Sequence, residues 1–408
     1  MLINKAIIIT IFTVIIPLLI QLAFLRYVSY YVEKDIYGEF VILSAFLYGL
    51  SQILLSIPGQ SFARFYNSAE NKIVFINEFR TYLIFINILS VFFFFILFLF
   101  YGSRFSLLTY LLLFVLFVLI NSYTLNQTIF LISMQRRVYF TLKIFEANAK
   151  YLFPLIMFLI FETLESFIGG IVFGYGISFI LLLYYLKDIP FKIENNFENC
   201  KKYLFFSYAI VFSATFSWSI SFSDRYFIDY FLTNEDIAEY SILSQFSGFA
   251  QVLGMIFSTY VTPIILKEYE RNKKRGLKIF KKYLIYFLLS LALLSFCVFL
   301  LPKNLLSIII KEETIFNQYY YNTFIILFLG VILTVFQTVL SLYFVLLKRL
   351  DILAKIFMLA AVINFGLNFF ISHYGIIAAA ISTFSAYLVL NVFILLWVKV
   401  HLDKAALN

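Results

Sequence analysis

The chain has 408 residues, of which 63% are hydrophobic and only 13% are charged, and its formal net charge is +9. Soluble domains are about half apolar and about a quarter charged, so this composition excludes a water-soluble globular protein and predicts one that crosses a membrane many times. The positive charge does not indicate nucleic acid, because most of it lies between the apolar runs.

The apolar runs predict transmembrane helices. In hydrocarbon all backbone polar groups must pair internally, which leaves helices or a closed barrel. Barrel strands alternate apolar and polar residues, whereas these runs are continuous and about 20 residues long, as a spanning helix requires. We therefore predict an all-α polytopic membrane protein with about twelve transmembrane helices. In chain order the expected spans are Ala6–Val28, Phe40–Ile57, Thr81–Tyr101, Phe105–Ser133, Val138–Phe161, Leu164–Leu186, Tyr203–Phe222, Ile237–Leu266, Tyr283–Leu301, Thr323–Leu347, Ile352–Ser372 and Gly375–Val398.

A charged segment with Pro190 divides these spans into two sets of six. The predicted domains are an N-terminal six-helix bundle at 1–186, a cytoplasmic linker at 187–202 and a C-terminal six-helix bundle at 203–408. The halves also share sequence, since Glu39–Phe46 matches Glu239–Phe246 at five of eight positions. Six spans are an even number, so the halves are expected to form a parallel repeat about a pseudo-twofold axis along the membrane normal.

Lysine and arginine predict the orientation. With the N-terminus in the cytoplasm, 24 of these residues fall on the cytoplasmic side and 6 on the other, and Lys150 lies within a span. Cytoplasmic loops carry an excess of Lys and Arg, so both termini are expected to be cytoplasmic. This basic side is also expected to attract anionic membrane lipid.

Charged residues within or beside the spans are candidate functional residues, because a charge at membrane depth is costly. Glu146 and Lys150 are four residues apart on one helical face and could bind a substrate anion or a proton, or serve only as a neutral packing pair. Asp224 and Arg225 lie in the densest acidic stretch of the chain, which also contains Asp229, Glu235, Asp236 and Glu239.

Two further arginines have alternative interpretations. Arg26 occupies the place in the repeat that corresponds to Arg225, and either residue could face a central cavity or extend to the outer interface. Arg64 follows Pro58 and Gly59 at the cytoplasmic end of the second span, where it could bind phosphate or anchor the helix. In span eleven, Asn364 and Asn368 are expected to bond to neighbouring helices.

The sequence argues against an enzyme. It contains no HExxH, GxSxG, phosphate-binding loop or metal-ligand cluster, and histidine occurs only twice. The segments between spans are also too short for the extramembrane loop that a membrane glycosyltransferase usually needs for its acid and base residues. We therefore expect neither a cofactor nor a metal.

Several short segments together resemble Wzx-type polysaccharide flippases of the multidrug/oligosaccharidyl-lipid/polysaccharide (MOP) exporter superfamily. The segments that carry the resemblance are Asp224-Arg225, Ala238-Glu239-Tyr240, Asp35–Phe40, Asn364–Asn368 and Tyr374–Ala380. The resemblance implies a MATE-like fold of two six-helix bundles around a central cavity. It also implies a monomer in the bacterial cytoplasmic (inner) membrane.

The implied activity is to move oligosaccharide repeat units on undecaprenyl pyrophosphate across that membrane by alternating access, for O-antigen or capsule and exopolysaccharide assembly. A polysaccharide polymerase and a chain-length regulator would be further partners. Cationic residues would meet the pyrophosphate, and the candidates are Arg64, Lys150, Arg26 and Arg225. Coupling to a proton or sodium gradient, or gating, would fall to Glu146 or Asp224.

Two alternatives remain at the level of sequence. A MATE-like drug antiporter of the same superfamily should bury acidic residues for cationic substrates, whereas the set here is balanced or basic. A membrane polysaccharide polymerase or glycosyltransferase is opposed by the half-length repeat and the short loops.

Overall fold

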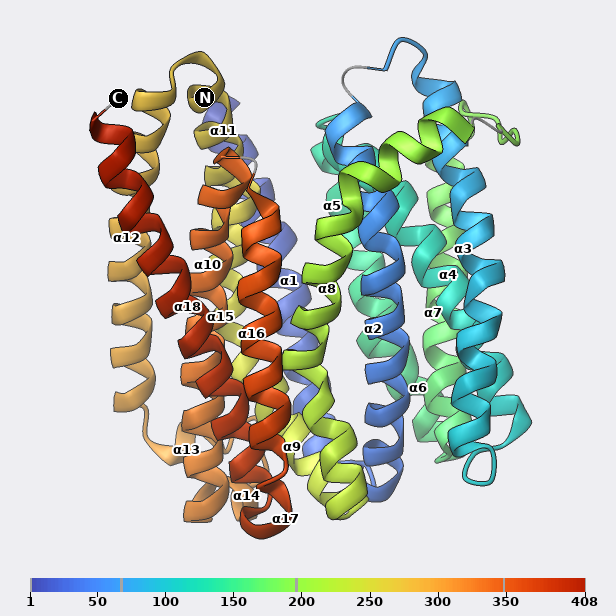
Figure 1. Cartoon of the computed structure of the whole chain (residues 1–408). Coiled ribbons are helices and arrows are strands. Elements are labelled where there is room, and N and C mark those ends of the chain that lie inside the picture. Colours follow the sequence, from blue (N-terminus) through green and yellow to red (C-terminus); the bar gives the residue numbers. More distant parts are fainter. Residues whose placement is uncertain (1, 67–68, 195–196, 348, 408) are drawn as a thin grey trace. The chain divides into compact units, whose positions relative to one another are not determined.

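The computed structural model describes residues 2–66, 69–194, 197–347 and 349–407. For some helical residues it describes the backbone only, namely 2–8, 10, 60, 63, 64, 197, 198, 200, 202, 204, 206, 263, 270 and 401–407. The described residues form helices joined by turns, and no strand occurs among them (Figure 1). The predicted all-α polytopic membrane protein is thus confirmed.

Most expected spans correspond to one continuous helix, while the fifth and eighth are built from consecutive shorter ones. The long helices are α1 (Leu2–Tyr31), α2 (Lys34–Phe65), α3 (Lys72–Tyr101), α4 (Leu107–Ile132), α7 (Leu164–Tyr185), α8 (Phe197–Phe231), α12 (Lys273–Leu300), α15 (Gln318–Leu347), α16 (Leu350–Asn368) and α18 (Ile376–Leu407). The fifth span comprises α5 (Arg136–Ala147), η2 (Asn148–Leu152) and α6 (Phe153–Phe161). The eighth comprises α9 (Asn234–Ser247), η3 (Gly248–Ala250), α10 (Gln251–Ile256), η4 (Phe257–Val261) and α11 (Thr262–Arg271). Short helices α13 (Lys303–Leu306), α14 (Glu312–Phe316) and α17 (Ile371–Tyr374) lie between spans.

Eleven of these helical segments are long and apolar enough to cross a membrane, counted over the described residues. The other expected span, Tyr203–Phe222, lies within α8. The third helix begins earlier than expected, at Lys72 instead of Thr81. Its first turns bury Arg80, which lies just outside the expected span Thr81–Tyr101 and bonds to Asn126 at 2.9 Å, so Arg80 is a packed helical residue.

Side-chain caps define where several helices begin. Asn71, Ser106 and Asn272 each accept a backbone N–H of the first turn of α3, α4 and α12. Thr163 and Thr233 form capping boxes at α7 and α9. The first N–H groups of a helix lack intrahelical partners, so these polar residues mark the boundary between connecting segment and helix.

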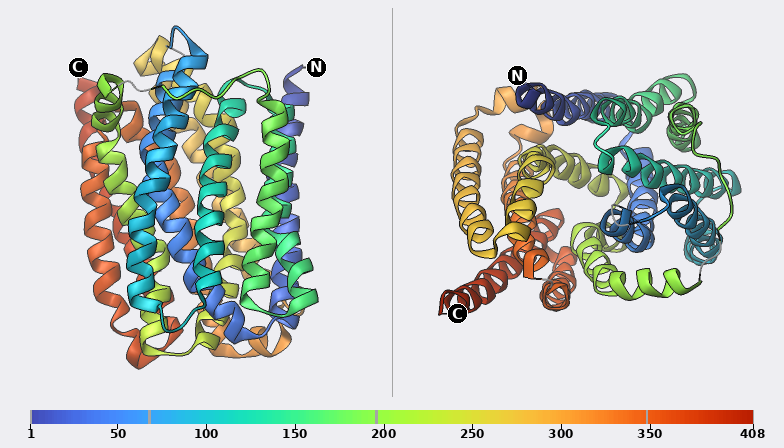
Figure 2. Two further views of the ribbon diagram at one scale, coloured as in Figure 1. Left: turned by 90° about the vertical axis from the view of Figure 1, so that its right-hand side faces the viewer. Right: turned by 90° about the horizontal axis from the view of Figure 1, so that it is seen from above.

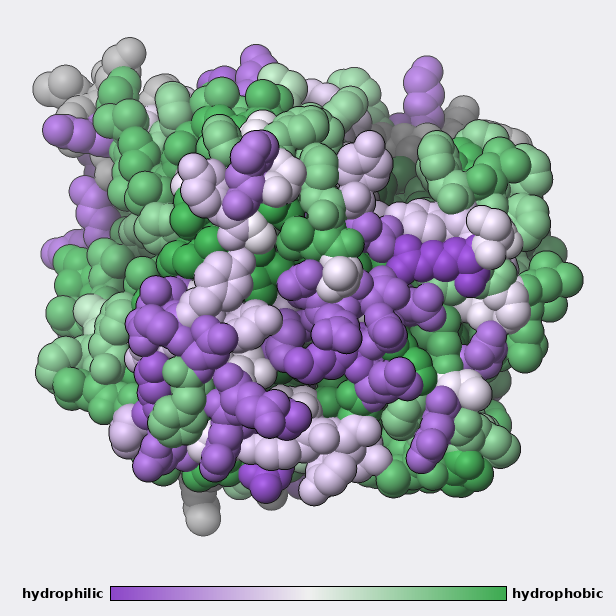
Figure 3. Space-filling view, turned by 90° about the horizontal axis from the view of Figure 1, so that it is seen from below, coloured by the Kyte–Doolittle hydropathy of each residue, from purple (hydrophilic) through white to green (hydrophobic). Residues whose placement is uncertain are grey.

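Surface character agrees with a membrane location. Large apolar side chains are exposed along α3 and α12, including Phe85, Ile88 and Phe92 of α3 and Leu289 and Leu293 of α12. Figure 3 views the end at which α13, α14 and α17 lie, and there hydrophilic residues gather. Apolar flanks and polar ends are the pattern that a lipid bilayer requires.

The described contacts divide the chain into two compact units. Unit 1 contains Met1–Leu18, Leu25–Val41 and Phe216–Asn408, and unit 2 contains Leu19–Phe24 and Ile42–Thr215. Helices α1, α2 and α8 therefore each contribute residues to both units. The boundaries predicted from sequence, 1–186, 187–202 and 203–408, follow the repeat rather than these contacts and stay a prediction.

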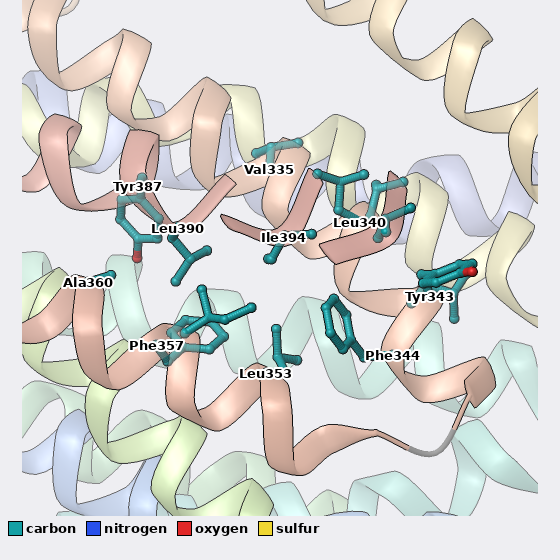
Figure 4. Packing of buried hydrophobic residues seen from close by; sticks show 14 of the residues in the cluster. Val335, Leu340, Tyr343, Phe344, Leu353, Phe357, Ala360, Tyr387, Leu390 and Ile394 are labelled. Carbon is teal, nitrogen blue, oxygen red and sulfur yellow. The ribbon is translucent and has the colours of Figure 1, made fainter. Parts of the chain in front are cut away.

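The core of unit 1 is a layer of apolar residues from α15, α16 and α18 (Figure 4). Phe344 of α15, Phe357 of α16 and Leu390 of α18 are among its buried members. Asn391 of α18 donates to the backbone carbonyl of Leu333 in α15 at 2.9 Å, which fixes the register of these two helices. The start of α1 and the end of α18, both in unit 1, lie at the same end (Figure 1), as an even number of crossings requires.

Unit 2 packs α4 and α6 against α7, which Figure 2 shows as neighbouring helices. Tyr123 of α4 and Tyr175 of α7 meet edge to face with ring centroids 5.7 Å apart, and both are fully buried. At one end of the unit, Tyr203 of α8 donates to the buried carboxylate of Glu78 in α3 at 3.2 Å. Unit 2 is therefore a packed body on which the fifth span is held.

Candidate functional site

One buried carboxylate in the fifth span is held between two lysines. Lys143 Nζ lies 2.7 Å from Glu146 Oε2, and Lys150 Nζ lies 2.7 Å from Glu146 Oε1. The spacings of three and four residues place all three side chains on one helical face. Glu146 is 7% exposed, whereas the lysine side chains retain 30% and 28% exposure. We call these three residues the Glu146 cluster, and its formal charge is +1.

The Glu146 cluster lies deep in the span. Glu146 is ten residues past Arg136, where the span begins, which is about 15 Å along a helix axis. The span continues to Phe161, so the cluster is near the middle of its length. The sequence indicated Glu146 and Lys150 but counted Lys143 among the 24 cytoplasmic Lys and Arg residues, although it lies within the expected span Val138–Phe161. The signal that could have identified Lys143 is its position three residues before Glu146.

A π-helical turn shapes the backbone that carries Lys150. It covers Asn148–Leu152, and Pro154 is the second residue after it. Proline has no N–H, and its ring clashes with the carbonyl four residues earlier, which here belongs to Lys150. A π-helical turn, in which the N–H of Phe153 bonds to the carbonyl five residues earlier at Asn148, relieves this clash, and such turns are frequent at functional sites. Pro154 thus explains why the helix leaves regular α geometry at Lys150.

Two glycines of α7 allow this turn to pack closely. A side chain at Gly174 would place its Cβ 2.6 Å from the Cα of Ala149, and at Gly170 it would lie 2.6 Å from the Cα of Pro154. Real Cβ atoms essentially never approach backbone so closely. Only glycine therefore lets α7 support the π-helical turn on both sides of Lys150.

Replacing Gly174 by leucine is expected to lower the free energy of unfolding by about 1–3 kcal/mol, because the added side chain overlaps the backbone of Ala149. Gly176→Leu is the matched control, since a Cβ at Gly176 of the same helix has no neighbour within 4 Å. Thermal unfolding of both purified variants measures the difference. Equal losses in both would show that the close contact is not what fixes the turn.

Tyrosines surround the Glu146 cluster. Lys150 Nζ lies 5.9 Å from the ring centre of Tyr48, and Lys143 Nζ lies 5.7 Å from that of Tyr139. The hydroxyl of Tyr123 donates to the backbone carbonyl of Leu142 at 2.6 Å. Aromatic faces attract cations at this range, so these rings hold the ammonium groups in place without neutralising them. The arrangement can bind an anion, because two cations share a single fixed carboxylate.

The second charged pair, Asp224 and Arg225, is more deeply buried. The two residues are 1% and 6% exposed, and Arg225 Nη1 lies 3.0 Å from Asp224 Oδ1. Tyr240 donates to the other carboxylate oxygen, which also accepts from Thr383 at 3.5 Å. Arg225 further donates to the backbone carbonyl of Ser221 at 2.8 Å. These contacts supply partners from within the fold for both buried charges.

The asparagines of α16 extend this polar network. Asn364 donates to Ser382 of α18 at 2.9 Å and accepts from Ser223 of α8 at 3.2 Å. Asn368 donates to Ser223 at 3.3 Å. The prediction that Asn364 and Asn368 bond to neighbouring helices is confirmed, and these bonds join α8, α16 and α18.

The two remaining cationic candidates differ in setting. Arg26 is exposed at the end of α1, where it donates to the backbone carbonyl of Ile308 and lies 5.4 Å from the ring centre of Tyr30. It therefore does not share the buried environment of its repeat counterpart Arg225. Arg64 belongs to α2, but its side chain lies outside the described residues. The structure brings Lys150 together with Glu146, and Arg225 with Asp224, as separate groups.

One charged group was not singled out from sequence. Glu239 of α9 is 3% exposed, forms an ion pair with Lys34 at the start of α2, and accepts from Thr314 of α14 at 3.1 and 3.2 Å. Close packing accompanies it, since a Cβ at Gly38 would lie 2.3 Å from the carbonyl oxygen of Asn234. In the repeat the counterpart of Glu239 is Glu39, and partners such as Lys34 and Thr314 from different parts of the chain leave no local pattern.

Comparison with known proteins shows which fold this is. The MatE family model matches residues 209–370. The structure is similar to that of the lipid II flippase MurJ in an inward closed conformation, with a TM-score of 0.70 and 16% identity over 97% of this chain and 87% of that one. It is equally similar to a MOP superfamily transporter from Pyrococcus furiosus, with a TM-score of 0.70 and 15% identity over 98% and 96% of the two chains.

The Vibrio cholerae MATE transporter VcmN, in a mutant form, gives a TM-score of 0.68 and 13% identity over 98% of this chain and 96% of that one. No curated protein matches the chain by sequence. At these low identities the likeness establishes a shared fold, which is that of MOP superfamily transporters.

Proposed function

We propose that the chain is a flippase that moves undecaprenyl-pyrophosphate-linked oligosaccharide across the bacterial cytoplasmic membrane by alternating access, for O-antigen or capsule and exopolysaccharide assembly. The observation that supports this best is the Glu146 cluster, whose two lysines outnumber its carboxylate at mid-membrane depth. A net positive site there favours an anionic substrate. The fold is compatible, because one similar structure is a lipid II flippase.

The proposed unit of function is a monomer, and a polymerase and a chain-length regulator act only as downstream partners.

The proposed orientation has both termini in the cytoplasm. Cysteine labelling in intact cells tests the orientation. A cysteine at Asn234 should react with an impermeant reagent from outside and one at Lys273 should not. The reverse pattern would overturn the topology.

Lys150→Gln is expected to reduce export of the polysaccharide at least about tenfold, because a charge-assisted contact to phosphate contributes about 1.5–3 kcal/mol. The test uses a polysaccharide-producing bacterium without its own flippase, complemented with the wild type or the variant. Surface polysaccharide and cytoplasm-facing lipid-linked repeat units are measured together with protein level. Lys355→Gln, which removes an exposed lysine of α16, is the control.

Wild-type protein that is inserted but restores no surface polysaccharide would contradict the flippase proposal.

A drug antiporter is the second candidate, since the MatE model matches residues 209–370 and Asp224 is a buried carboxylate in that region. It predicts proton- or sodium-driven efflux of cationic dyes that depends on Asp224. Its weakness is that Arg225 already neutralises this carboxylate.

A further inference from the structure

The Glu146 cluster contains an anion of its own. The carboxylate presents one oxygen to each lysine, Oε1 to Lys150 and Oε2 to Lys143, both at 2.7 Å. A phosphate group would present two of its oxygens to the same ammonium groups in the same way. Glu146 itself is buried, whereas about a third of each lysine side chain remains accessible. The lysines can therefore be reached by a second anion while Glu146 holds them in place.

We propose that Glu146 is a built-in competitor for the substrate: its carboxylate occupies the lysine pair in the empty protein, and the diphosphate of a lipid-linked sugar displaces it. This inference rests on the proposed flippase function and assigns its headgroup site to Lys143 and Lys150. The displaced carboxylate stays beside the diphosphate and repels it, because like charges at a few ångströms in a low-dielectric site interact strongly. Glu146 thereby weakens binding and favours release.

Two other roles for Glu146 fit the geometry less well. A carboxylate that binds a coupling proton or sodium ion needs to be open to a cation, yet both of its oxygens already contact ammonium groups that repel one. A pair that only specifies packing needs one lysine, and a second would add an uncompensated charge at membrane depth. Two accessible lysines on one buried carboxylate are what a site for anion exchange requires.

Binding of inorganic pyrophosphate and of a short-chain prenyl pyrophosphate to the full chain in lipid nanodiscs tests the inference. We expect Glu146→Gln to bind both probes about tenfold more tightly than the wild type, since the competing charge is gone. Lys143→Gln and Lys150→Gln are expected to bind them about tenfold more weakly. The corresponding prenyl alcohol distinguishes recognition of the diphosphate from recognition of the lipid chain.

Glu165→Gln is the matched control, because this carboxylate of α7 in the same unit accepts from Ser106 at 2.7 Å and Thr109 at 3.0 Å and contacts no lysine in the described part of the chain. Its affinity for pyrophosphate should equal that of the wild type. Glu146→Asp is a second variant in case the glutamine variant does not fold. It keeps the charge but is one methylene shorter, so it should hold the lysines less well and bind pyrophosphate with intermediate affinity.

Equal or weaker pyrophosphate binding by folded Glu146→Gln, or by folded Glu146→Asp, would overturn the inference even if the wild type exports polysaccharide. Tighter binding by these variants supports it, even if complementation fails and the flippase proposal falls. In the export assay Glu146→Gln should accumulate bound substrate and export slowly, because release is impaired. Fast export by a variant with tighter binding would contradict the proposed role of Glu146 in release.

Discussion

Replacing Asp224 by alanine is expected to lower the free energy of unfolding by about 3–5 kcal/mol, the usual loss when one partner of a buried ion pair is removed. Arg225 is 6% exposed and would keep its charge with only the backbone carbonyl of Ser221 as a polar partner among the described contacts. Tyr240 and Thr383 would also lose their acceptor. Thermal unfolding of the purified protein and its level in the membrane measure the effect.

Asp351→Ala is the control for this variant, because Asp351 pairs with Arg349 at 3.2 Å while both side chains are almost half exposed. Pairs of that kind contribute about 0–1 kcal/mol, so the control should unfold at nearly the wild-type temperature. The double variant Asp224→Ala with Arg225→Leu should recover part of the stability, since no unpaired charge is left buried. No recovery would show that the network around Tyr240 matters more than the ion pair.

Much of the fold could be predicted because lipid imposes a simple rule. An apolar run of about 20 residues must be a helix, and this holds wherever the run packs. The rule does not locate the starts of helices as well, because α2 and α3 begin at Lys34 and Lys72, in polar segments that precede the apolar runs. Polar residues there are paired inside the fold, as Arg80 is with Asn126, and hydropathy cannot distinguish such pairs from a solvated loop.

The candidate site was predictable only in its local part. Glu146 and Lys150 share one helical face, so spacing alone indicated their contact. The contribution of Lys143 depends on the depth of the span, and the π-helical turn depends on Pro154 together with the close approach of Gly174. Glu239 was visible as one of five acidic residues, but its partners Lys34 and Thr314 are about 200 and 75 residues away. No local pattern records such contacts.

Replacing Glu239 by alanine is expected to lower the free energy of unfolding by about 1.5–3 kcal/mol, the range for hydrogen bonds to a charged group. The loss is smaller than for Asp224, because Lys34 is 38% exposed and can be hydrated when its partner is removed. Glu235→Ala is the matched control, since Glu235 lies one turn earlier on α9 and is exposed. Hydrogen exchange and thermal unfolding should both leave the control close to the wild type.

The effect of Glu239→Ala should be local as well as global. Glu239 ties the start of α2 to α9 and α14, and the end of α1 is tied to the same region, with Tyr30 donating to the carbonyl of Ser307 at 2.7 Å. Both α1 and α2 contribute to two compact units, and the residues of unit 1 that connect them are Leu25–Val41. Loosening their contacts should speed hydrogen exchange there, because local opening needs less free energy than global unfolding. Unchanged exchange across 25–41, despite a lower unfolding temperature, would show that Glu239 stabilises α9 without holding the turn between α1 and α2.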